Sequence, residues 1–291
     1  MRRLVLLAAV LLSACQQTAA DARQARPALW RMADKDTTIY LFGSIHLLPK
    51  DLSWHTPALT SAIAKSQGLI LETVLDKNPA AMAALMQQIG MSPNLPPLVD
   101  RVPADKRKAV EAAAKKAGVP LAVLDKFETW AAALTLASAG LRDIGLSTEF
   151  GVEDTLRKSF TDAGKSVSGL ETPAEQLGYF DTLPEETQRE FLVGILEDDK
   201  NAAKEFAKMI RAWSSGDTAM IAATFDDELK SSGPLADALL VKRNQRWAAW
   251  LAERMKKPGT VFVAVGAGHL AGTNSVQSML AKRGFRVWRV Q

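Results

Sequence analysis

Cysteine and histidine are scarce in this chain, and each scarcity excludes a class of site. The 291 residues include one cysteine, which excludes an internal disulfide framework and any metal site built from several cysteines. They include three histidines, so a site made only of imidazoles could use at most three of them. Each histidine can therefore be examined by itself.

An excess of charge of either sign is also missing. Lysine and arginine number 36 and aspartate and glutamate 32, which gives a net charge of +4 at neutral pH. This balance, together with 7% aromatic residues and no alternation of basic and aromatic side chains, gives no indication of a nucleic-acid partner. Hydrophobic residues make up 47% and charged residues 23%, a composition typical of globular proteins and not of disordered, collagenous or coiled-coil chains.

The apolar run at the N-terminus is too short to span a bilayer. It covers residues 4–12 and follows Arg2 and Arg3, a pattern typical of a secretory signal peptide. The segment LSAC at 12–15 resembles the bacterial lipobox, in which cleavage precedes the cysteine and the thiol is lipidated. We therefore expect a lipoprotein signal peptide over residues 1–14 and a lipid on Cys15. A buried core cysteine, the alternative, fits poorly with the apolar run and arginines before it.

The segment after Cys15 indicates where the protein lies. Residues 16–26 are polar and small, as in a flexible tether. Gln16 stands where inner-membrane lipoproteins often carry aspartate, which favours the outer membrane. We expect a membrane-anchored protein of the cell envelope that faces the periplasm or lies on the cell surface. Its tether would cover residues 15–27 and its folded domain residues 28–291.

The order of the predicted elements indicates an α/β fold. Strands are expected over 28–33, 37–42, 67–73, 167–172, 260–265 and 285–290. The strand at 260–265 is apolar nearly throughout, which is typical of a central strand covered on both faces. Two intervening stretches, about 79–165 and 174–257, read as mostly helical. We therefore expect a central β-sheet with a large helical insertion or cap.

Two details of the helical stretches are specific enough to test. In the first, apolar residues recur at intervals of three and four from 121 to 141, which predicts one continuous helix. In the second, breaks are expected near Pro184, Gly216 and Pro234. Between the first two breaks an apolar stripe runs from Phe191 to Trp213, which predicts one long helix with a single buried face.

Four of the predicted strands end in residues that can carry out chemistry. Two are followed by a glycine and, three residues later, a histidine: His46 and His269. Two others end in the carboxylates Glu72 and Glu171. Open α/β sheets bind ligands at the carboxyl ends of their strands, so these side chains are expected to meet. Imidazole and carboxylate ligands with an open position suit a catalytic divalent metal, and a spare carboxylate could accept a proton from its water.

Each of these residues also has a purely structural interpretation. A histidine in a loop is usually solvated or held by hydrogen bonds, although two of the three here share one context. Glu171 precedes Thr172, where a helix is predicted to begin, and a carboxylate there can stabilise the helix N-terminus. Arg243 and Asn244 could bind a carboxylate or phosphate group of a substrate, could hold Glu72 or Glu171, or could belong to a solvated helix face.

The chain resembles the TraB/PrgY/GumN family, to which the animal Tiki proteins are related. The resemblance is carried by an ordered set of segments: YLFGSIHLLP at 40–49, LILET at 69–73, LETPAEQL at 170–177, KRNQRWA at 242–248 and TVFVAVGAGHLAG at 260–272. It implies an α/β core related to the erythromycin-esterase and ChaN-like group.

The same resemblance implies a divalent metal site formed by the two Gly-x-x-His motifs and a glutamate. His46, His269 and Glu72 match these ligands, and the expected ion is manganese, cobalt or zinc. Glu171, Arg243 and Asn244 match further family positions. We expect Glu171 to act as general base or fourth ligand, and Arg243 and Asn244 to bind the substrate.

The resemblance leaves more than one function open. Tiki proteins act as metal-dependent proteases, so the first expectation is a metal-dependent hydrolase of the cell envelope, with peptidase activity as the form to test and Glu72 and Glu171 as its catalytic carboxylates. The alternative is a non-catalytic protein that binds and sequesters a peptide or a small signalling molecule. A third expectation, hydrolysis of small esters, follows from the related fold.

Overall fold

A computed structural model describes residues 24–74, 78–143, 150–198, 202–229 and 232–291. The predicted signal peptide, Cys15 and most of the predicted tether lie outside these residues. The end of the tether does not hang free of the domain, because Ala25 is buried and its N–H donates to the carbonyl of Ser53 at 2.7 Å. Within the described part of the chain, no helix is both long enough and apolar enough to cross a membrane.

The described residues form one six-stranded sheet, in the order β4-β3-β5-β2-β1-β6. Its strands are β1 (Leu29–Ala33), β2 (Thr37–Ser44), β3 (Gly68–Thr73), β4 (Ser166–Glu171), β5 (Gly259–Gly266) and β6 (Val287–Arg289). The strands β4, β3, β5 and β2 are parallel, whereas β1 and β6 are antiparallel to their neighbours. The predicted α/β class is confirmed, and β5 is the central strand that its apolar sequence indicates.

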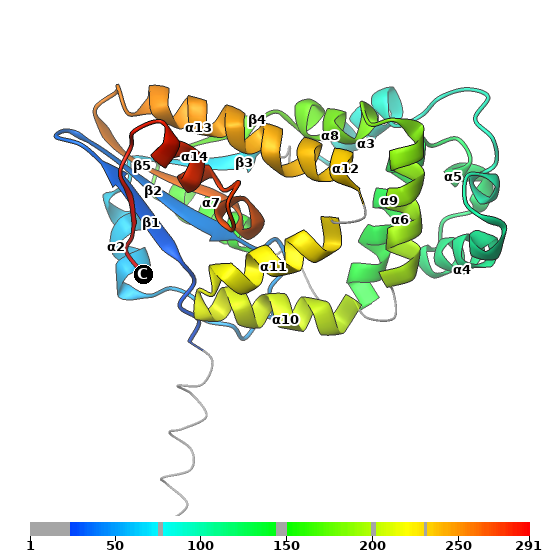
Figure 1. Ribbon diagram of the computed structural model, residues 1–291, viewed down its shortest axis with the longest axis horizontal. Helices are drawn as coiled ribbons and strands as arrows, with labels where there is room; N and C mark the ends of the chain where they lie inside the picture. Colours follow the sequence, from blue (N-terminus) through cyan, green and yellow to red (C-terminus); the bar gives the residue numbers. More distant parts are fainter. Residues whose placement is uncertain (1–23, 75–77, 144–149, 199–201, 230–231) are drawn as a thin grey trace, which may run out of the picture.

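Helices cover both faces of the sheet (Figure 1). Successive side chains of a strand point to opposite faces, so Phe262 and Val263 of β5 belong to two separate cores. The face of Phe262 is covered by α2 (Pro57–Lys65), α7 (Val152–Asp162), α10 (Ala202–Ser215) and α11 (Thr218–Leu229). The face of Val263 is covered by α13 (Lys242–Arg254) and α14 (Val276–Lys282).

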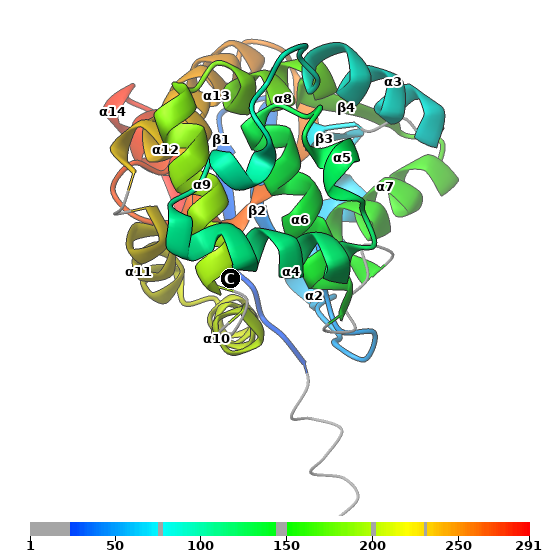
Figure 2. The ribbon, with the colours of Figure 1, turned by 90° about the vertical axis from the view of Figure 1, so that its right-hand side faces the viewer.

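A helical lobe stands at one end of the molecule, and Figure 2 looks onto it. It contains α4 (Arg107–Ala117), α5 (Leu121–Leu124), α6 (Thr129–Asp143) and α9 (Glu185–Asp198), with the short helices η2 (Leu98–Asp100) and η3 (Ala104–Lys106). Its core is separate from the sheet and includes the fully buried Val110, Leu124 and Leu192. The helices α3 (Pro79–Ile89) and α8 (Pro173–Asp181) connect this lobe to β3 and β4, as the predicted insertion requires.

The prediction of one helix over 121–141 is wrong, because α5 and α6 are separated by residues 125–128. Arg101 is buried beside this break and donates to the carbonyls of Asp125 at 2.7 Å and Phe127 at 2.6 Å. The Asp125 carboxylate in turn accepts from the N–H of Leu98 at 2.7 Å. These contacts come from a distant loop, so the local periodicity carries no sign of the break.

The prediction of one helix from Phe191 to Trp213 is also wrong. Phe191 belongs to α9 and Trp213 to α10, and the two residues contribute to different cores. The stripe is apolar throughout because each helix buries its own face. The predicted breaks near Pro184, Gly216 and Pro234 are confirmed. At the last of them Ser232 is extended, and Pro234 lies in the first turn of α12 (Gly233–Ala236), which leads through the π-helix η5 (Asp237–Val241) into α13.

Candidate functional site

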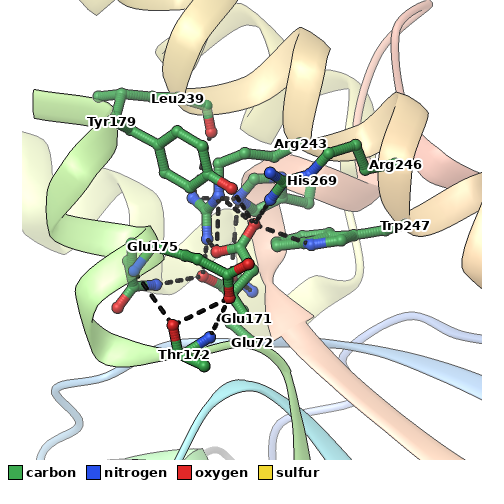
Figure 3. A network of polar contacts seen from close by, with 12 residues as sticks. Glu72, Glu171, Thr172, Glu175, Tyr179, Leu239, Arg243, Arg246, Trp247 and His269 are labelled. Atoms are coloured by element: carbon green, nitrogen blue, oxygen red, sulfur yellow. Dashed lines mark hydrogen bonds and ion pairs between the residues drawn. The ribbon is translucent and has the colours of Figure 1, made fainter. Parts of the chain in front are cut away.

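The carboxyl ends of three parallel strands and the start of α13 meet at one point (Figure 3). Glu72 comes from β3, Glu171 ends β4, and His269 lies in the short helix η6 (Ala267–Leu270) directly after β5. Arg243, in the first turn of α13, reaches in between them. All four side chains are buried, and Arg243 contacts each of the other three. We call Glu72, Glu171, Arg243 and His269 the buried frame.

Every N–H group of Arg243 has a partner inside the protein. Its Nε donates to Glu171, at 3.1 Å from Oε1 and 3.2 Å from Oε2. Its Nη2 donates to Glu72 Oε2 at 2.7 Å and Glu171 Oε2 at 2.9 Å, while Nη1 contacts the Leu239 carbonyl and His269 Nε2, both at 3.2 Å. A guanidinium has five N–H donors, so Arg243 keeps none for a substrate carboxylate in this arrangement. Of the open interpretations, the contacts show it holding Glu72 and Glu171.

Glu171 accepts hydrogen bonds from aromatic and basic residues around it. Its Oε1 accepts from the Tyr179 hydroxyl at 3.1 Å, from Arg246 Nη2 at 2.9 Å and from the Trp247 indole at 2.9 Å. The role of helix cap belongs instead to its neighbour Thr172, which forms a capping box with Glu175 at the start of α8. The carboxylate of Glu171 therefore serves the buried frame and leaves the helix N-terminus to Thr172.

Glu72 remains ionised although it is buried. Its Oε1 accepts from the Gly266 N–H at 2.6 Å, and its Oε2 accepts from Gln176 at 3.2 Å as well as from Arg243. Burial alone would raise the pKa of Glu72, but the charge that His269 acquires when it is protonated in acid, the charge of Arg243 and the Gly266 hydrogen bond lower that pKa to about 2. At neutral pH the Glu72 carboxylate is therefore negatively charged, its charge is balanced by Arg243, and it is a weak base.

His269 is held as a neutral imidazole in one tautomer. The Asn244 amide donates to the carbonyl of Asn274 at 2.8 Å, which turns its oxygen towards His269 Nδ1 at 2.6 Å. Nδ1 must therefore carry the proton, and the lone pair on Nε2 faces Arg243. Burial and the charge of Arg243 outweigh the charge of Glu72 and lower the pKa of His269 to about 4. Asn244 thus fixes His269, and its own polar atoms are occupied by protein groups.

His46 is placed differently from the buried frame. Its side chain is 68% exposed, and Nδ1 lies 2.8 Å from Oε1 of Glu153, in the first turn of α7. The contact with Glu153 and its negative charge raise the pKa of His46 to about 9, so the imidazole is positively charged at neutral pH. His46 follows β2, whose last residue Ser44 pairs with Gly266 of β5, so His46 lies at the same edge of the sheet as His269. Among the described residues, however, no contact joins it to Glu72 or His269.

The donors predicted for a metal do not fit one ion in this arrangement. The Nε2 lone pair of His269 is taken by Arg243, and Arg243 also contacts Glu72, whose Oε1 lies 3.6 Å from His269 Nε2. His46 pairs with Glu153 and stays outside this set. Across the described ranges, no group of three or more His, Cys, Asp or Glu side chains has a metal-binding arrangement. A divalent ion between Glu72 and His269 requires Arg243 to move, and the metal site stays a prediction.

Sequence reasoning missed three residues of this region, Glu153, Tyr179 and Arg246. Arg246 had a usable signal, because it follows Arg243 by three residues and so lies on the same side of α13. Glu153 and Tyr179 had none, since their partners His46 and Glu171 are joined to them only by the fold.

A cavity of about 360 Å³ lies on the Asn244 side of His269. Its walls are mostly apolar or small and come from α11, the α12–η5 segment and the loop after β5. They include Phe225, Leu240, Val241 and Gly268, while Asn244 and Asn274 supply polar groups. A small apolar group could therefore be bound next to the residues that hold His269.

Substituting Gly268 with alanine is expected to lower the free energy of unfolding by about 1–3 kcal/mol. A Cβ atom at this position would meet the ring of Phe225 at 2.6 Å, so either this ring or α11 itself would have to shift. The control is Gly194→Ala in α9, where no atom lies within 4 Å and the change should be neutral or stabilising. Urea unfolding of both variants tests this, and equal stabilities would contradict it.

Comparisons with known proteins agree with the resemblance carried by the sequence segments. The chain is 24% identical to the protein named "Uncharacterized protein YbaP" of Escherichia coli over 245 residues, 83% of this chain and 87% of that protein. The protein of the same name from Shigella flexneri matches over the same shares at the same identity. No solved structure gives a significant match. The family match spans residues 28–289, from the start of the sheet to its last strand, and the chain belongs to the TraB/PrgY/gumN family.

Proposed function

We propose that this chain is a hydrolase of the bacterial cell envelope that cleaves an acyl bond, with peptides as the first substrate class to test. The observation that carries the proposal is the exposed, positively charged imidazole of His46 at the sheet edge where the buried frame lies. Ligands of open α/β sheets bind at this edge. A titratable side chain with a perturbed pKa at such an edge is a candidate for proton transfer.

The reaction assigns one role to His46 and another to the buried frame. Water adds its oxygen to the carbonyl carbon, the bond to the leaving nitrogen or oxygen breaks, and the leaving atom takes a proton from His46. His46 regains a proton from the attacking water, so the enzyme ends as it began. The frame supplies no proton, because Glu72 is a weak base and His269 has both ring nitrogens occupied. The buried frame instead holds the ends of β3, β4 and β5 together and supplies the charged groups near His46.

The cellular location is part of the same proposal. The basic start, the short apolar run and the lipobox-like LSAC segment support export and lipidation at Cys15. Ala25 and Gln24 contact the loop at Ser53, so a lipid at Cys15 would hold the domain within a short distance of the membrane. The substrates would then be peptides or acyl compounds of the envelope.

The test is incubation of the purified protein with a peptide library and a panel of small esters. New peptide termini in mass spectra, or ester turnover, are expected. Intact peptides and esters across both panels would overturn the proposal.

A second candidate function is binding without cleavage. The cavity beside Asn244 favours it, because its mostly apolar walls could hold a peptide side chain or a small molecule while the buried frame stays closed. In the same incubation, peptides that are retained by the protein but remain intact would favour this binder over the hydrolase.

Metal dependence, the form of hydrolysis that the family resemblance implies, can be measured separately. Because Arg243 contacts both Glu72 and His269, we expect calorimetry to detect no stoichiometric binding of manganese, cobalt or zinc. We also expect chelators to leave hydrolysis unchanged. Stoichiometric binding that is lost in the His269→Ala variant would contradict this expectation and support the sequence-based metal site.

A further inference from the structure

We propose that one face of α10 is a membrane-contact surface that binds the headgroups of anionic phospholipids. Lys204, Lys208 and Arg211 define this surface, which we call the basic face of α10. The inference goes beyond hydrolysis and rests on the proposed lipid anchor at Cys15 only for bringing the domain to a bilayer. It determines which side of the domain faces the membrane.

The first support is the place where the chain enters the folded domain. Gln24 forms a β-bridge with Ser53, and the N–H of Arg26 donates to the carbonyl of Ser214, in the last turn of α10, at 2.7 Å. Cys15 precedes Gln24 by nine residues, which span at most roughly 30 Å. A lipid on Cys15 therefore keeps the bilayer close to α10, which both views place at the end of the molecule where the described chain starts (Figures 1 and 2).

The second support is the amphipathic character of α10. Trp213 is buried in the core on the sheet, and Ile210 packs against the same core. The three basic residues recur at intervals of four and three, so Lys204, Lys208 and Arg211 share the opposite face of the helix. The face that α10 turns away from the sheet is therefore positively charged.

Further basic residues lie around the end of α10. Arg26 is exposed, and Arg289 donates through Nη2 to the backbone carbonyl directly after the helix at 2.8 Å. Glu205, the acidic residue of α10, lies 3.6 Å from Lys208, and Asp217 follows in the next turn. Across α10, this turn and the two arginines, five basic side chains stand against two acidic ones. Each Lys or Arg near an anionic bilayer strengthens binding by roughly five-fold.

Solvation is the usual explanation of a basic helix face, and the position of α10 is what favours a membrane. On α4, Lys108 and Lys115 are also exposed and share one face, but they belong to the helical lobe. The basic face of α10 lies beside the chain entry, and α10 covers the face of the sheet opposite to α13. A domain that rests on α10 therefore turns α13, which carries Arg243 of the buried frame, away from the bilayer (Figure 1).

The test uses the full lipidated protein in vesicles of phosphatidylcholine, with and without phosphatidylglycerol. A fluorophore on Ala207→Cys reports from the exposed side of α10, and one on Ala249→Cys reports from α13. Cys15 carries the lipid, so each introduced cysteine supplies the free thiol of its variant. Energy transfer to headgroup-labelled lipid should be larger from position 207 when phosphatidylglycerol is present. This difference should be lost in phosphatidylcholine alone or at high salt, which screens the attraction.

Charge reversal supplies the matched comparison. Lys204→Glu combined with Arg211→Glu should abolish the difference between the two label positions. Lys108→Glu combined with Lys115→Glu reverses two exposed charges at the same spacing on α4 and should keep the difference. Equal transfer from the two positions in the wild type, or a difference that survives the α10 reversal, would overturn the proposal and leave α10 a solvated face.

The mass of the intact protein keeps this inference separate from the proposed anchor. If Cys15 carries no lipid, the anchor fails, and sedimentation of the same protein with phosphatidylglycerol vesicles decides about α10. Binding that weakens by roughly ten-fold or more after the α10 reversal supports the membrane-contact surface. Absence of binding, or binding that the reversal leaves unchanged, overturns it. A failure of the hydrolysis assays bears on neither result, because vesicle contact requires no turnover.

Discussion

Replacing Arg243 with methionine is expected to lower the free energy of unfolding by about 3–5 kcal/mol, the usual cost of removing one partner from a buried ion pair. The Arg243 side chain is 8% exposed and contacts Glu72 at 2.7 Å and Glu171 at 2.9 Å. Methionine fills much of the same space but carries no charge, so two buried carboxylates lose their shared cation. Urea unfolding of the purified variant measures the loss.

The matched control is Arg246→Met, three residues further along α13. Arg246 also contacts Glu171, at 2.9 Å, but its side chain is 51% exposed. Exposed ion pairs contribute about 0–1 kcal/mol, so this variant should remain close to wild type. Equal losses in the two variants would contradict the assignment of Arg243 as the central cation of the frame.

The loss of stability in Arg243→Met should also depend on pH and should become smaller in acid. The pKa of Glu72 is about 2 in the folded protein, against an ordinary value of 4.5. Its ionised form therefore stabilises the fold above about pH 4.5, and this contribution is lost as the pH falls towards 2. Without Arg243 the pKa of Glu72 rises, so the difference between wild type and Arg243→Met should be largest at neutral pH and shrink on acidification.

The strand ends could be predicted from sequence because their signal is local. An apolar run that stops at a glycine or a carboxylate marks the end of a strand, and parallel topology then brings such ends to one edge. This reasoning placed Glu72, Glu171 and His269 together, as the structure does. It placed His46 at the same edge but could not show that its partner is Glu153.

The roles of the assembled residues could not be predicted, because they depend on which polar atoms are already occupied. For Arg243 the sequence left substrate binding, support of a glutamate and a solvated helix face open. All five N–H groups of Arg243 are directed at protein acceptors, so its role in this structure is to support the two glutamates.

The helix boundaries failed where tertiary contacts override local periodicity. The residues between α5 and α6 satisfy the apolar spacing of a helix, yet Arg101 takes the backbone carbonyls of Asp125 and Phe127 that a continuous helix would use. A buried arginine has to satisfy its donors, and backbone carbonyls of an interrupted helix are acceptors that remain available. The interruption therefore follows from the burial of Arg101, which periodicity does not reveal.

Replacing His46 with alanine is expected to abolish most of the hydrolysis while leaving the fold intact. A positioned general acid or base contributes roughly 10²–10⁴-fold to a rate, so kcat should fall by this order. The His46 side chain is 68% exposed, and its ion pair with Glu153 should contribute little to stability, so the thermal unfolding midpoint should hardly change. Kinetics and thermal unfolding of one preparation measure both effects.

The chain offers a matched control in His55, another exposed histidine on the same loop region after β2. Its ring stacks on Trp54 with the centroids 4.0 Å apart, and no carboxylate among the described residues pairs with it. His55→Ala removes an imidazole of the same exposed kind and should retain wild-type hydrolysis. If His46→Ala hydrolyses as fast as His55→Ala, proton transfer by His46 is excluded. Catalysis would then have to come from the buried frame, which requires Arg243 to release Glu72 or His269. That movement would free Glu72 and His269 as metal ligands, so the metal site would become the leading explanation.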